Sequence, residues 1–191
     1  MNTLHFQPER ASERVAHVAG GCALPEGCEW PKDGNGKPLL HVMTLPAAWV
    51  EPGSAGWLSL FTPYYQADTY LHWEELTTEG CNESVVLFHD NDGVLRNEYG
   101  DLSPARGLSL GEGAAVERYG SRVNGAVAWL QDSESVPGSR CRMMINGDEL
   151  DVGFSEEPGI FSDGVLYVFL SDAFQLASRP SRQGVLTFQF S

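Results

Sequence analysis

Pro38-Leu39-Leu40-His41-Val42-Met43 is the stretch that decides the fold, because this apolar, strand-like run lies inside an ordered series of turn and anchor residues. His17-Val18-Ala19-Gly20-Gly21 precedes it and predicts a tight turn. Trp30-Pro31 follows that turn, and Gly56-Trp57-Leu58-Ser59-Leu60-Phe61 comes after the apolar run. The order is therefore a glycine turn, a tryptophan anchor, a strand, and a closing strand that starts with glycine.

The same order occurs a second time, about a hundred residues later. Arg122-Val123-Asn124-Gly125 supplies the turn, and Trp129 supplies the anchor. Arg142-Met143-Met144-Ile145 supplies the strand, and Asp163-Gly164-Val165-Leu166-Tyr167-Val168-Phe169-Leu170 supplies the closing strand. Such a repeated order of motifs predicts a duplication within the chain.

The duplication is expected inside one domain, residues 1–191, with halves that span roughly 17–62 and 121–170. No stretch has the length or composition of an interdomain linker. A short amphipathic helix is predicted at Phe6–Val18, where alanine and valine recur on one helical face. Segments rich in branched and aromatic residues dominate elsewhere, so the predicted class is α+β, mostly β, with two pseudo-repeated β-rich halves.

Strands are predicted wherever a short apolar run is bounded by turn residues. They are Leu39–Leu45, Trp57–Thr62, Ser84–His89, Arg140–Ile145, Glu149–Phe154, Val165–Leu170 and Val185–Phe190. We interpret Asn146-Gly147 as a two-residue type I′ hairpin turn, because both central residues of that turn need positive φ. The segment Tyr64–Glu79 is ambiguous. Leu71, Glu75 and Glu79 fit a helix, whereas Tyr70–Trp73 fits a strand, and a strand entering a loop is favoured.

The repeated motifs also carry a family resemblance. Their order along the chain is Gly20-Gly21, Leu24-Pro25, Trp30-Pro31, Gly36-Lys37-Pro38-Leu39 and Asp163-Gly164-Val165-Leu166-Tyr167-Val168-Phe169. In this order the chain resembles the YwqG-like family of bacterial proteins, from roughly Gly20 to Phe190. The resemblance implies no enzymatic activity. It implies a place beside polymorphic or secreted toxins, where members look like immunity proteins. Some relatives carry paired cysteines before the second strand, whereas this chain has Cys141 alone, so no metal role is carried over.

The composition sets the class of protein. The chain is long enough and apolar enough for one well-formed core. Its longest uninterrupted apolar run, Val165–Leu170, is far shorter than the roughly 18 residues of a membrane span. Met1–Arg10 has no apolar signal-peptide core. A cytoplasmic location with reduced cysteines is therefore expected, and a disulfide between Cys22 and Cys28 stays open for an oxidising compartment.

The net charge of −14 is segregated along the chain. Between Asp68 and Asp101, nine acidic residues accompany one basic residue, Arg96, which makes −8. Between Asp148 and Asp172 there are seven acidic residues and no basic one, which makes −7. The resulting field repels nucleic-acid phosphates and anionic membranes, and it attracts a basic partner.

Charge and resemblance together predict a non-enzymatic, acidic immunity protein. It would bind and neutralise a co-produced bacterial toxin, such as a nuclease delivered by a secretion system, by blocking the basic active-site face. In this interpretation carboxylates stand in for the phosphates that the toxin normally holds. The predicted contact residues are Glu74, Glu75, Asp90, Asp92, Glu156 and Glu157. Acidity that serves only solubility is the competing explanation.

No motif in the chain predicts catalysis, a cofactor or a metal. His89-Asp90-Asn91-Asp92-Gly93 resembles part of a calcium loop, but the twelfth position is Tyr99 rather than glutamate, so an ordinary turn is favoured. The histidines lack zinc-ligand spacing, and we interpret His41 as a hydrogen-bonded histidine of a strand or core. Nucleophile elbows and phosphate loops are missing.

Two other function classes stay open. One is a ligand-binding or enzymatic domain whose site lies in the cleft between the two repeats, at the glycine turns Gly20-Gly21 and Asn124-Gly125. The other is a stable scaffold protein. A toxin-like adjacent gene favours inhibition, and a metabolic operon favours an enzyme.

Overall fold

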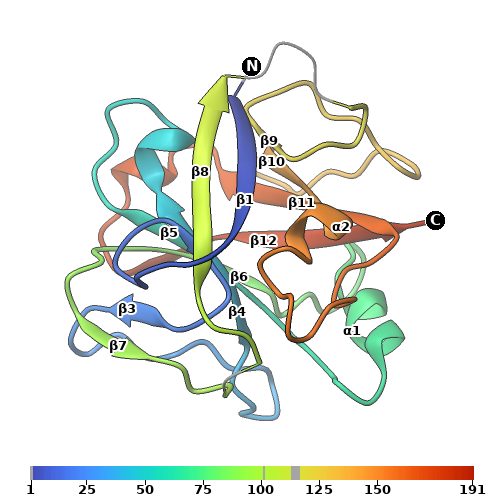
Figure 1. Cartoon of the computed structure of the whole chain (residues 1–191). Coiled ribbons are helices and arrows are strands. Elements are labelled where there is room, and N and C mark those ends of the chain that lie inside the picture. Colours follow the sequence, from blue (N-terminus) through green and yellow to red (C-terminus); the bar gives the residue numbers. More distant parts are fainter. Residues whose placement is uncertain (1, 101, 113–116) are drawn as a thin grey trace.

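The apolar stretches of the two repeats form strands at equivalent places in a closed antiparallel barrel (Figure 1). The structure is a computed structural model that describes residues 2–100, 102–112 and 117–191. The barrel strands, in their order around the barrel, are β1 (Asn2–Arg10), β8 (Arg106–Glu112), β2 (His17–Val18), β4 (Leu40–Pro46), β5 (Trp57–Thr62), β6 (Val85–His89), β12 (Ser181–Phe190), β11 (Gly164–Ser171), β10 (Ser139–Asn146) and β9 (Arg122–Val123).

The remaining elements are short and are not part of the barrel. A two-stranded sheet joins β3 (Cys22–Leu24) and β7 (Val94–Arg96). The helical elements are η1 (Ala47–Trp49), α1 (Thr69–Glu75), α2 (Gly147–Leu150) and η2 (Phe174–Leu176). In the described part of the chain, no helix has the length and apolarity that crossing a membrane requires.

The two repeats pair their strands in the same way. β2 pairs with β4 and β4 with β5, just as β9 pairs with β10 and β10 with β11. β4 and β10 each carry one register shift against the closing strand. The residues that follow β2 and β9, Ala19 and Asn124, both have positive φ, at 57° and 53°. The remaining strands complete the ring, because β8 joins β2 to β1 and β6 joins β5 to β12.

Alternate residues of each barrel strand pack into one large core. In β5, Leu58 and Leu60 belong to the large core cluster. Phe61 lies on the opposite face, in a separate cluster with Trp30. The equivalent outer face of the second repeat holds Tyr167, against which Trp129 packs. Each repeat therefore has its own tryptophan outside the shared core.

Six predicted strands are confirmed with small changes at their ends. They are the segments of β4, β5, β6, β10, β11 and β12. All four cysteines are free thiols, so the structure contains no Cys22–Cys28 disulfide.

The predicted α+β class with an N-terminal helix at Phe6–Val18 is wrong. The fold is nearly all β, and the segment forms β1 followed by a loop and β2. Val15, on the predicted apolar face, is 49% exposed. Pairing with a distant strand decides the structure instead, because β1 hydrogen-bonds with β8 and places Leu4 opposite Leu110. Local periodicity carries no information about such a partner.

The predicted hairpin turn at Asn146-Gly147 and the strand Glu149–Phe154 are also wrong. Asn146 caps α2, because its side chain accepts a hydrogen bond from the backbone N–H of Glu149 at 3.0 Å. A Cβ on Gly147 would lie 1.7 Å from the Phe161 carbonyl oxygen, so this glycine permits a close backbone approach. Tyr70–Trp73, favoured as a strand, lies within helix α1.

Candidate functional site

A cavity of about 440 Å³ lies beside helix α1 and is lined mainly by carboxylates. We call it the acidic cavity. Four glutamates line it: Glu74 and Glu75 at the end of α1, and Glu79 and Glu83 in the loop that leads to β6. The loop 33–37 contributes Asn35 to the lining.

Hydrogen bonds hold two of these carboxylates in place. Glu83 Oε1 accepts from the backbone N–H of Gly34 at 2.7 Å, which fastens loop 33–37 to the cavity. Tyr65 donates its hydroxyl to the Glu75 carboxylate, at 3.2 Å from Oε2. Asp33 shapes the loop itself, because its Oδ1 accepts from the backbone N–H groups of Asn35 and Lys37. The cavity is therefore built from segments that are distant in the sequence.

Burial, with a smaller effect of like charges, disfavours the ionised form of one carboxylate in this cavity. The pKa of Glu75 is raised, first because burial removes water from the carboxylate, and then because Glu83 and Asp33 are negative and close. Burial and the nearby Glu75 charge also raise the pKa of Tyr65 to about 12. A cation that enters the cavity would relieve this repulsion.

Lys37 lies near the cavity but is engaged elsewhere. Its Nζ donates to the Tyr64 carbonyl oxygen at 2.7 Å. The same ammonium group lies 4.7 Å from the centre of the Tyr65 ring and 5.3 Å from that of Tyr99. Because aromatic faces and a carbonyl hold this ammonium group, the four glutamates keep capacity for another cation.

The structure divides the six predicted contact residues among separate places. Glu74 and Glu75 lie together in the acidic cavity. Glu157 lies beside residues 64–66. Its Oε1 accepts from the Tyr64 hydroxyl and from Gln66 Nε2, both at 3.2 Å.

The other three predicted residues, like Glu157, lie outside the cavity lining. Asp90 forms an ion pair with Arg179 at 3.2 Å, and Asp92 is exposed in the turn after β6. Glu83 precedes β6 and Asp90 follows it, so the strand separates them by about 20 Å. Glu156 forms an ion pair with Arg106 at 3.4 Å. The six residues are not gathered in one cavity.

The prediction missed Glu79, Glu83 and Asp33. Glu79 and Glu83 lie within the acidic run from Asp68 to Asp101, so the charge count contained a signal for them. Asp33 lies in a different segment, and the hydrogen bond from Gly34 of its loop to Glu83 joins that segment to the cavity.

A second group of polar residues is buried on the outer face of the first repeat. Ser59 Oγ lies 2.6 Å from Thr44 Oγ1, 2.8 Å from His89 Nε2 and 3.2 Å from Cys22 Sγ. His41 Nε2 lies 2.8 Å from Thr44 Oγ1, which confirms the interpretation of His41 as a hydrogen-bonded strand histidine. We call these five residues the buried polar chain.

The buried polar chain has the properties of a structural network. Its five side chains are at most 1% exposed. Burial raises the pKa of the Cys22 thiol to about 11, so the thiolate is scarce near neutral pH. Burial also lowers the pKa of His41 well below its usual value, so its imidazole stays neutral. Residues so buried and uncharged stabilise the outer face rather than meet a substrate.

Replacing Ser59 with alanine should lower the free energy of unfolding by about 1–3 kcal/mol, because Thr44 and His89 would lose a buried partner. Urea denaturation measures this loss. Thr187→Val is the matched control, since the Thr187 hydroxyl is buried without a hydrogen-bond partner within the described residues. That control should be neutral or stabilising. Equal losses in the two variants would contradict a special role for the network.

Within residues 2–100, 102–112 and 117–191, no group of three or more His, Cys, Asp or Glu side chains could hold a metal ion. Comparison with known proteins adds no further constraint, because no protein-family model and no curated protein matches the chain. The YwqG-like resemblance therefore stays a prediction.

Proposed function

We propose that the chain is a non-enzymatic immunity-type protein that binds a basic bacterial toxin through the acidic cavity. The observation that carries this proposal is the convergence of four glutamates on one cavity, where burial and like charges raise the pKa of Glu75. The segregated charge of the chain and the resemblance to the YwqG-like family support the same function. A nuclease is the toxin class whose substrate face best complements such a cavity.

The cavity suits a lysine or arginine side chain of the partner. A guanidinium group can donate paired hydrogen bonds to a carboxylate, and such charge-assisted bonds are roughly twice as strong as neutral ones. Tyr65 stands beside Glu75 and holds its carboxylate in place through the hydroxyl hydrogen bond. The long-range field of the acidic residues would increase the association rate, most strongly at low salt.

Charge reversal in the cavity tests this proposal. The double variant Glu74→Lys/Glu79→Lys should weaken binding to the toxin encoded by the adjacent gene by about 100-fold or more, chiefly through slower association. Surface plasmon resonance at low and high salt measures both the affinity and the salt dependence. The salt dependence of association should shrink in the variant.

A matched control separates the cavity from net charge. Glu26→Lys/Glu117→Lys changes the net charge equally, and both residues are exposed in the structure. This control should keep nearly full affinity. Equal weakening in both double variants would show that overall charge, rather than the acidic cavity, governs binding.

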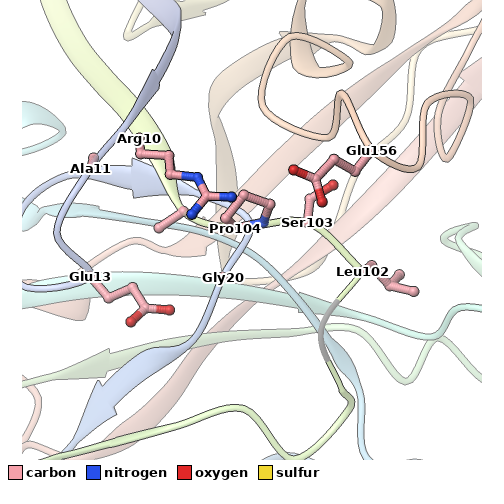
Figure 2. Close-up of a pocket in the computed structure, with 9 residues that line it drawn as sticks. Arg10, Ala11, Glu13, Gly20, Leu102, Ser103, Pro104 and Glu156 are labelled. Atoms are coloured by element: carbon pink, nitrogen blue, oxygen red, sulfur yellow. The ribbon is translucent and has the colours of Figure 1, made fainter.

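A second candidate function is ligand binding in the cleft between the repeats, and one observation favours it. A cavity of about 450 Å³, which we call the seam cavity, is lined by Gly20 of the first repeat and Glu156 of the second (Figure 2). The predicted turn Gly20-Gly21 thus contributes to it. The predicted turn Asn124-Gly125 does not line it. The Asn124 side chain instead donates to the Val50 carbonyl oxygen.

A further inference from the structure

The seam cavity has walls that hydrogen bonds hold in place. The backbone N–H of Gly20 donates to the Ser103 carbonyl oxygen at 3.1 Å. Glu13 Oε1 accepts from the backbone N–H of Gly21 at 2.5 Å. The end of β1 is tied to the same region, since the Ala11 N–H donates to the Ala105 carbonyl oxygen at 2.9 Å. The cavity is a fixed feature of the junction between strands.

Gly20 has no side chain, and this leaves space in the cavity wall. Its φ is +65°, a conformation that favours glycine. A Cβ at this position would lie 2.7 Å from Glu13 Oε1 and 2.8 Å from Ala105 Cβ. A larger residue would therefore strain the turn and crowd the cavity wall.

Two polar groups of the lining have no partner within the described residues. Ser103 is 4% exposed, and its buried hydroxyl makes no hydrogen bond there. Arg10 lines the cavity from the end of β1, and its guanidinium group forms no ion pair with any described residue. Buried hydroxyl groups are normally hydrogen-bonded, and Ser103, which lines the cavity, has hydrogen-bonding capacity left for a ligand.

Carboxylates of the lining complement these donors. Figure 2 shows Arg10 reaching towards Pro104, with Glu156 and Ser103 drawn on one side of its guanidinium group and Glu13 on the other. A simple anion would be repelled by the two glutamates, and a simple cation would be repelled by Arg10. A molecule that carries both charges satisfies both sets of groups.

We propose that the seam cavity binds a small zwitterion of the amino-acid or short-peptide class. Arg10 and the Ser103 hydroxyl bind its carboxylate, and Glu13 and Glu156 receive its ammonium group. Arg106 holds Glu156 in position through the ion pair of 3.4 Å. The volume of about 450 Å³ falls in the range of small-molecule sites and exceeds the needs of a single ion.

This inference rests on the second candidate function and is independent of toxin binding. Isothermal titration of the full chain with the dipeptide Ala-Ala and with L-alanine tests it. Propionate and ethylamine, each with one of the two charges, are the control probes. At least one zwitterion should bind with a dissociation constant in the millimolar range or tighter, while neither control probe should bind comparably.

Variants then locate the binding. Arg10→Ala should weaken zwitterion binding by about tenfold or more, whereas Arg14→Ala, which removes an exposed arginine outside the cavity lining, should not. Ser103→Ala should weaken binding while the melting temperature stays unchanged or rises, because the lost hydroxyl makes no internal hydrogen bond. A lower melting temperature with unchanged binding would show that Ser103 is only structural and would overturn its assigned role.

The outcomes separate the inference from the function on which it rests. Binding of propionate or ethylamine as tight as that of the zwitterions, and sensitive to Arg10→Ala, would overturn the zwitterion assignment and keep a ligand site. The absence of binding by every probe would overturn both the assignment and the second candidate function. Zwitterion binding that is insensitive to Arg10→Ala would show that the zwitterion binds outside this cavity.

Discussion

Replacing Trp30 with alanine is expected to lower the free energy of unfolding by about 3–5 kcal/mol, the range for large aromatic residues in a core. Trp30 is 2% exposed and packs edge-on against Phe61, with ring centroids 5.1 Å apart. Its indole N–H donates to the Leu39 carbonyl oxygen at 2.9 Å. The substitution would leave a cavity and also deprive a buried carbonyl of its donor. Urea denaturation monitored by circular dichroism measures the loss.

The repeat supplies the control for this prediction. Trp129 occupies the matching place in the second half, but it is only half-buried and stacks on Tyr167 with ring centroids 4.5 Å apart. Trp129→Ala should therefore lower the free energy of unfolding by a smaller amount, about 1–2 kcal/mol. Equal losses in the two variants would contradict the difference in burial between the two outer clusters.

Acid should destabilise the protein strongly, because three buried histidines are held neutral. Burial lowers the pKa values of His41, His72 and His89, and that of His72 falls to about 4. Below pH 6.5 the histidines of the unfolded chain bind protons that the native state does not bind. The free energy of unfolding that these histidines contribute is therefore present above this pH and is lost as the pH falls. His72 alone should remove about 3 kcal/mol by pH 4.

Two carboxylates act in the opposite direction over part of this range. The pKa values of Glu75 and Asp151 are raised, chiefly by burial, so their protonation favours the native state at low pH. The variant His72→Gln isolates the histidine contribution, because glutamine does not titrate. Urea denaturation between pH 7 and pH 4, pH values that bracket the His72 shift, should show a shallower decline for this variant. An identical decline would show that His72 does not contribute.

The sequence predicts the central strands of the barrel well and its closure poorly. β4, β5, β11 and β12 are apolar runs bounded by turn residues, so local composition is sufficient to find them. β1 and β8 are mixed in polarity, and their residues pair across about 100 positions. Because β1 is stabilised by that distant pairing, its local pattern favoured a helix that does not form.

The candidate site, like the fold, is predictable only where its residues lie close together in the sequence. Glu74 and Glu75 are adjacent in the sequence, and the acidic run from Asp68 to Asp101 predicted that negative charge would gather there. Charge counting could not distinguish Glu83, which faces the cavity, from Asp90, which an ion pair with Arg179 engages at the other end of β6. The seam cavity combines Arg10, Gly20, Ser103 and Glu156, and no local pattern connects these positions.

The proposal that the acidic cavity binds a basic toxin is tested most directly by co-expressing this chain with the product of the adjacent gene. Growth and co-purification are scored for the native chain, for Glu74→Lys/Glu79→Lys and for the control Glu26→Lys/Glu117→Lys. The proposal predicts that the native chain and the control restore growth and form a stable complex, and that the cavity variant does neither. A toxic neighbour that the native chain neither binds nor neutralises, or a cavity variant that protects fully, would contradict it.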